Sequence, residues 1–143
     1  MTKHLGMGVM LSQLAGSSDS AAAFVASVGK EAVSLELTKD KWDEYKELVF
    51  TFTDGTQLMI FDEGQSCCES RYMTTDDDLA GFVGSTLLEA EVADAPNIIG
   101  GYGDHEVQFL HVKTSRGTFT VETHNEHNGY YGGFAVACRL VEP

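Results

Sequence analysis

Residues 48–61 constrain the fold more than any other part of the sequence, because they predict a β-hairpin. Two apolar runs flank the dipeptide Asp54-Gly55. An Asp-Gly pair in this position favours a two-residue type I′ turn, and such a turn fixes the strand register. With that turn, Phe50 pairs with Met59. Both faces of the hairpin then carry apolar side chains, so we expect a helix or another subunit to cover each side.

Alternation of apolar and polar residues indicates further strands elsewhere in the chain. The predicted strands cover residues 33–37, 86–92, 105–113, 117–124 and 133–141. The turn between the third and fourth of them is predicted at Ser115-Arg116-Gly117, where glycine follows two polar residues. In the last strand Cys138 falls on the apolar face, which is typical of a small core residue.

Two segments have the features of helices. Serines 17, 18 and 20 with Asp19 are N-cap candidates for a helix over 19–29. Thr75 followed by three aspartates predicts a short capped helix that ends at Gly84. The same aspartates also suggest a calcium loop, but the alternating ligand spacing and the glycine turn of such loops are absent. The capped helix is therefore the favoured interpretation.

These elements predict an α+β protein with an antiparallel sheet of six to seven strands and one or two helices. Residues 1–30 are rich in Gly, Ala and Ser and are interpreted as an N-terminal arm or helix, while residues 31–143 form a single α+β domain. A chain of 143 residues is long enough to bury a core of this kind.

Composition narrows the classes of partner. Asp and Glu number 22 against 9 Lys and Arg, which gives a net charge of −13. Nucleic acid and anionic membrane surfaces are therefore unfavourable partners, because binding to phosphates depends on Lys and Arg. Three cysteines, two of them adjacent, do not form a disulfide framework, and a reducing compartment is the simpler interpretation.

Two short runs, 67–72 and 124–134, concentrate polar, ionisable and aromatic residues. One possible chemistry is metal binding, for which the available ligands are Cys67, Cys68, His124 and His127. Adjacent cysteines lack the spacing of a structural zinc site, so we expect no metal. Catalysis by a cysteine–histidine pair is a further alternative, but no oxyanion-hole pattern is recognisable. The sequence therefore predicts no enzyme and no cofactor.

Ligand binding fits the two runs best. The candidate residues are Arg71, Tyr72, Asn125, Asn128, Tyr130 and Tyr131. Tyrosine rings stack on the face of a base or sugar, and an arginine grips phosphate through paired hydrogen bonds. The neighbouring glycines let backbone amides approach a ligand closely. The alternative is that residues 128–129 form only a turn, which would not exclude binding.

Residues 65–79, which include the first run, and residues 124–134 resemble a family of small proteins encoded by tailed bacteriophages and prophages. The resemblance extends over roughly residues 30–141. A looser resemblance, through Cys-Cys-Glu and Asn-Gly-Tyr-Tyr, connects the chain to phage proteins similar to oligomeric sponges for nucleotide immune signals. That resemblance implies a homo-oligomer in the cytoplasm of the infected host, with a nucleotide-like ligand at Arg71, Asn128 and Tyr130. The alternative is a structural or decoration protein of the virion, which would bind other virion proteins.

Overall fold

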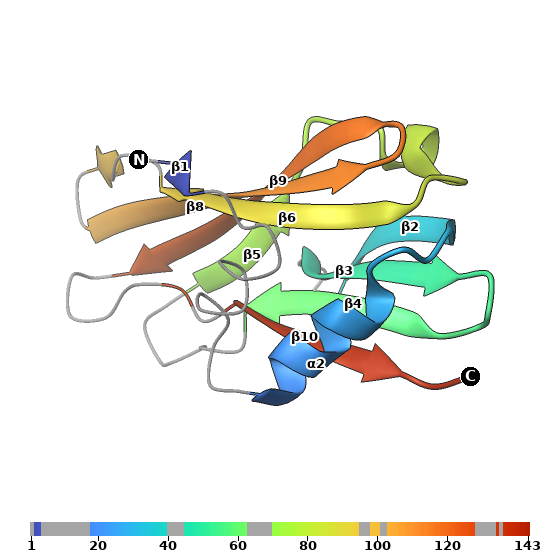
Figure 1. Cartoon of the computed structure of the whole chain (residues 1–143). Coiled ribbons are helices and arrows are strands. Elements are labelled where there is room, and N and C mark those ends of the chain that lie inside the picture. Colours follow the sequence, from blue (N-terminus) through green and yellow to red (C-terminus); the bar gives the residue numbers. More distant parts are fainter. Residues whose placement is uncertain are drawn as a thin grey trace.

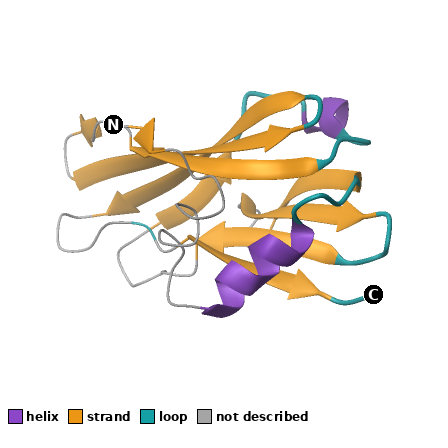
Figure 2. Cartoon of the chain, in the orientation of Figure 1, coloured by secondary structure: helices purple, strands orange, loops and turns teal. Residues whose placement is uncertain are grey.

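The computed structural model describes residues 2–3, 18–39, 45–62, 70–94, 98–100, 103–127, 134 and 136–143. These residues form two antiparallel sheets that lie face to face (Figures 1 and 2). The six-stranded sheet has the order β1 (Thr2–Lys3), β6 (Leu87–Asp94), β8 (Gly103–Thr114), β9 (Gly117–His127) and β5 (Ser70–Thr74), with β7 (Ile98–Gly100) paired to β8. The four-stranded sheet has the order β10 (Val136–Val141), β4 (Gln57–Asp62), β3 (Tyr45–Phe52) and β2 (Ala32–Lys39).

The prediction of an antiparallel, mixed α and β fold is confirmed in outline, although strands dominate. The predicted single sheet of six to seven strands is wrong, because the described strands form two sheets, of six and four strands. The described part of the chain has a single α-helix, α2 (Ser18–Ser27), and a short 3₁₀ helix, η1 (Leu79–Phe82). Two sheets are needed because each one turns an apolar face inward and buries it against the other. The division into an N-terminal arm or helix (1–30) and a single domain (31–143) stays a prediction, because residues 4–17 lie outside the described residues.

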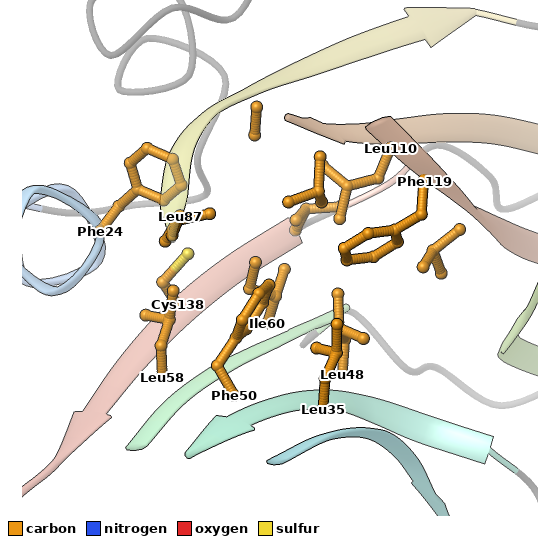
Figure 3. Packing of buried hydrophobic residues seen from close by; sticks show 14 of the residues in the cluster. Phe24, Leu35, Leu48, Phe50, Leu58, Ile60, Leu87, Leu110, Phe119 and Cys138 are labelled. Carbon is orange, nitrogen blue, oxygen red and sulfur yellow. The ribbon is translucent and has the colours of Figure 1, made fainter. Parts of the chain in front are cut away.

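The core lies between the sheets and is rich in aromatic and branched side chains. Phe50 and Phe119 come from opposite sheets, and their ring centroids are 6.3 Å apart. Figure 3 shows them among the other buried apolar residues, together with Phe24 from the helix. Cys138 is 5% exposed, as expected from the sequence, and burial raises the pKa of its thiol to about 12. The thiol is therefore protonated at neutral pH and acts as a core residue.

Helix α2 packs along β10, the last strand of the four-stranded sheet. The Ser20 hydroxyl accepts a hydrogen bond from the backbone N–H of Cys138 at 3.1 Å and lies 3.3 Å from the carbonyl oxygen of the same residue. Phe24, on the same helix, is fully buried. The helix thus supplies hydrogen-bond partners to a strand edge that would otherwise be open to pairing with another chain.

The 48–61 hairpin is confirmed, but its predicted register is wrong by one residue. Phe50 pairs with Leu58, because the loop contains three residues and not two. The backbone N–H of Phe52 donates to the carbonyl of Thr56 at 2.9 Å, and Gly55 has φ +87°. The common three-residue hairpin loop consists of a type I turn followed by a residue of positive φ, which is often glycine.

The side chain of Asp54 explains this longer loop. Its carboxylate accepts hydrogen bonds from the hydroxyl of Thr56 at 2.6 Å and from the backbone N–H of Thr56 at 2.9 Å. Lys30 lies 2.9 Å from the same carboxylate. These contacts lower the pKa of Asp54 to about 2, and the hydrogen bond from the Thr56 hydroxyl has the largest effect. An aspartate bonded to the residue two positions ahead favours an Asx-turn over a type I′ turn.

The short helix predicted between Thr75 and Gly84 is confirmed at its end, where Gly84 follows the C-cap Val83 and has φ +91°, but its predicted start is wrong. Only η1 is helical, and Asp78 is its N-cap. The side chains expected to start the helix bind β9 instead. The Thr75 hydroxyl donates to the carbonyl of Thr120 at 2.6 Å, and the Asp77 carboxylate accepts from the N–H of Thr120 at 2.8 Å. These tertiary contacts take the place of the helix cap.

The two ends of the sandwich differ. Short connections at residues 53–56 and 115–116 lie at one end. Strands β2, β4, β6 and β9 finish at the opposite end, where β3, β5, β8 and β10 begin (Figure 1). We call this opposite end, with Asp62 at the end of β4 and Ser70 at the start of β5, the loop end. It carries all the described candidate site residues.

Candidate functional site

Strand alternation separates the candidate residues that are neighbours in sequence. Arg71 pairs with Asn125 in the register of β5 and β9, and the adjacent Tyr72 pairs with His124. Arg71 and Asn125 are buried, whereas Tyr72 and His124 are only partly buried. Successive side chains of a strand point to opposite faces of the sheet. The candidates therefore form an inner cluster between the sheets and an outer cluster on the other face of the six-stranded sheet.

The inner cluster consists of Arg71, Asp62, Lys46 and Asn125. One guanidinium nitrogen of Arg71 donates to both carboxylate oxygens of Asp62, at 2.7 and 2.9 Å. Their side chains are 8% and 5% exposed. Because Asp62 belongs to the four-stranded sheet, this ion pair connects the two sheets. The ammonium group of Lys46 donates to the backbone carbonyl of Arg71, and Asn125 is fully buried.

The outer cluster is a series of rings on three adjacent strands. The ring of Tyr72 (β5) stacks on that of His124 (β9), with centroids 4.6 Å apart and planes 7° from parallel. The centroid of the His105 ring (β8) lies 5.1 Å from that of His124. The hydroxyl of Tyr72 donates a hydrogen bond to the carboxylate of Glu126. Planar groups flanked by polar ones are the usual components of a site for a planar ligand.

Hydrogen bonds hold the central imidazole at both nitrogens. Nδ1 of His124 is 2.9 Å from Nε2 of His105, and Nε2 of His124 is 2.7 Å from the hydroxyl of Thr74. Burial lowers the pKa of His124, and the nearby His105 lowers it further, while Glu126 opposes both effects. A neutral imidazole has one donor and one acceptor, which is the pattern that these two partners satisfy. The ring of His124 is thus kept neutral and fixed in orientation.

Other predicted residues lie outside the described part of the chain. These are Cys67, Cys68, Asn128, Tyr130 and Tyr131. The backbone of His127 pairs with Asp104 at the end of β9, but its side chain is not described. Their roles as ligands therefore stay predictions.

The sequence reasoning missed His105, Thr74, Glu126 and Asp62. The signal for His105 was present, because the turn at 115–116 sets a register in which His105 pairs with Glu126. That register puts His105 diagonally beside His124. The partner of Arg71 had no comparable signal, because Asp62 lies in the other sheet and no hairpin connects the two residues.

Within the described ranges, no group of three or more His, Cys, Asp or Glu side chains is arranged to hold a metal ion. The same part of the chain has no helix with the length and apolar character that crossing a membrane requires. Comparison with curated proteins and with solved structures found no match. Residues 26–136 match a family model described as a domain of unknown function, DUF7448, and the chain belongs to that family.

Proposed function

We propose that this protein is not an enzyme and binds a small nucleotide-like ligand at the loop end of the sandwich. The observation that carries the proposal is the outer cluster, where the Tyr72, His124 and His105 rings lie in series beside Thr74 and Glu126. A planar base stacks on such rings, and its amino group donates to a carboxylate such as that of Glu126.

The wider context follows from the resemblance described above. We propose a phage-encoded homo-oligomer that acts in the cytoplasm of the infected bacterium and withdraws a nucleotide signal of host defence. The net charge of −13 favours a ligand held by stacking and by local donors over one held by a general positive field. Contacts from Asn128, Tyr130 and Tyr131 belong to this proposal as predictions.

The ion pair changes the role proposed for Arg71. Its guanidinium lies 2.7 Å from the carboxylate of Asp62 and is almost fully buried. Binding of a ligand phosphate by this arginine would require breaking a buried ion pair, which is costly. A role in holding β5, and with it Tyr72, in position is therefore favoured. We therefore keep Arg71 as a positioning residue in the proposal, while a direct phosphate contact stays an untested prediction.

The cysteine whose position is described, Cys138, does not fit a catalytic role, while Cys67 and Cys68 lie outside the described residues. A cysteine nucleophile must reach the thiolate state, usually in an electropositive, partly exposed site. Cys138 is buried and its pKa is raised to about 12 by burial, so it does not fit that role.

Calorimetry tests the proposal. Wild-type protein should release heat with at least one member of a panel of cyclic nucleotides and ADP-ribose derivatives. Tyr72→Ala and His124→Ala should weaken that binding by about five- to 150-fold, because loss of one stacked base contact costs roughly 1–3 kcal/mol. His111→Ala is the matched control, because His111 also bonds a threonine hydroxyl of the same sheet, at 2.7 Å, but lies away from the outer cluster.

Each result is decisive for the site. Equal weakening by the His111 variant would remove the outer cluster from the proposal. No heat from any member of the panel would favour the second candidate, a virion structural or decoration protein, for which the acidic charge of −13 is the supporting observation. Mass spectrometry of purified particles would then detect the chain at a stoichiometric level.

A further inference from the structure

A groove of about 460 Å³ lies between the edges of the two sheets. It borders the outer cluster at Thr74, whose hydroxyl is 2.7 Å from His124. It is lined by residues Leu35, Glu36 and Leu37 of β2, Thr74 and Thr75 at the end of β5, and Asp77, Asp78, Leu79 and Ala80 at the start of η1. Its volume lies within the range of ligand and peptide pockets, roughly 300–1,000 Å³.

The groove is on the side of the sandwich that α2 does not cover. Helix α2 packs on β10, whereas β2 is the strand at the opposite end of the four-stranded sheet. Strand β5 is likewise the last strand of the six-stranded sheet among the described residues. Edge strands of this kind accept an additional extended segment through their backbone groups.

The interior of the groove is apolar and its rim is acidic. Leu35 is 6% exposed, and Leu37 and Leu79 are partly buried against the core. Glu36, Asp77 and Asp78 have exposed side chains, and none of the described residues that line the groove is Lys, Arg or His. An occupant must therefore offer apolar groups to the floor and positive charge to the rim.

Two rim carboxylates are fixed in position by the backbone. Asp77 accepts from the N–H of Thr120 at 2.8 Å, and Asp78 accepts from the N–H of Ala80 at 3.1 Å. Carboxylates held in this way lose little conformational entropy when a cation approaches, so they favour binding more than mobile ones would.

From this geometry we propose that the groove binds an extended segment of a partner protein in which basic and apolar residues alternate. Alternation sends apolar side chains to the leucine floor and basic ones to the carboxylate rim, because successive side chains of an extended chain point in opposite directions. Backbone pairing along β2 would supply part of the affinity. This inference does not depend on the proposed nucleotide site.

A fluorescein-labelled hexapeptide, Lys-Val-Lys-Leu-Lys-Val, is the probe, and fluorescence anisotropy at low salt is the measurement. The acidic counterpart Glu-Val-Glu-Leu-Glu-Val should bind at least tenfold more weakly. Raising the ionic strength from 0.02 to 0.5 M should weaken the basic peptide, because exposed charges are screened over a few ångströms at that salt.

Two variants with the same charge change locate the site. Glu36→Lys removes one rim carboxylate, and Glu142→Lys makes the same change near the C-terminus, away from the groove. We expect Glu36→Lys to weaken the peptide at least threefold more than Glu142→Lys does. Both residues are exposed, so neither change should affect folding.

Amide chemical-shift mapping with the same peptide supplies a second measurement. The largest shifts should fall within residues 35–37 and 74–80. Shifts centred on another surface, equal effects of the two variants, or equal binding of the acidic peptide would each overturn the proposal. Absence of binding at millimolar peptide would overturn it as well.

Discussion

Replacement of Arg71 by methionine should destabilise the protein strongly. Methionine preserves much of the length and apolar character of the side chain but removes the guanidinium, and with it the ion pair that Arg71 makes with the Asp62 carboxylate. That carboxylate is 5% exposed and accepts two hydrogen bonds from Arg71, at 2.7 and 2.9 Å. The variant therefore tests whether the ion pair between the two sheets holds them together.

The expected loss is large compared with the stability of an ordinary domain. Removing one partner of a buried ion pair costs about 3–5 kcal/mol, because the remaining charge loses that partner's compensation in a poorly solvated site. A domain of this size has a free energy of unfolding of about 5–15 kcal/mol. Combining Arg71→Met with Asp62→Leu removes both charges, so the double variant should be more stable than Arg71→Met alone.

Urea unfolding followed by circular dichroism measures the effect. With a slope of about 2 kcal/mol per molar urea, the midpoint of Arg71→Met should fall by about 1.5–2.5 M. Arg139→Met is the control. Arg139 is 57% exposed and lies 3.6 Å from Glu47, and its loss should cost less than about 1 kcal/mol. Equal losses for the two arginine variants, or a double variant weaker than the single one, would refute the reasoning.

Three further predictions concern pH, metal and assembly. The free energy of unfolding should decrease as pH falls below about 6.5. The reason is that the pKa of His124 is lowered in the folded chain, so the unfolded chain binds a proton at a higher pH than the folded chain does. Urea unfolding at several pH values should show a smaller dependence for His124→Gln. Dialysis against a strong chelator should leave the melting temperature unchanged, since Cys67 and Cys68 lack chelating spacing, and a decrease that zinc reverses would contradict this. Sedimentation at micromolar concentration should show at least a dimer, and a monomer of 15.5 kDa would remove the oligomer from the proposed function.

The sequence predicted local features well where hydrophobic alternation and turn chemistry act together. Strands β8 and β9 lie within three residues of their predicted boundaries, with the turn where it was predicted, and the helix α2 begins within one residue of its predicted start. The failures occur where a polar side chain binds a backbone group. Asp54 lengthens the first hairpin through Thr56, and Thr75 binds the carbonyl of Thr120 in place of capping a helix.

The candidate site shows a second limit, which follows from the geometry of strands. Arg71 and Tyr72 are adjacent in sequence and were expected to bind one ligand, but a strand sends them to opposite faces. The third ring on the outer face belongs to His105, which precedes His124 by 19 positions in sequence. Its Nε2 atom lies 2.9 Å from Nδ1 of His124. In a chain dominated by strands, register identifies the members of a site better than proximity in sequence does. For that reason the experiments above change one face at a time. Variants of Tyr72 and His124 report on the ligand, and variants of Arg71 and Asp62 report on the connection between the sheets.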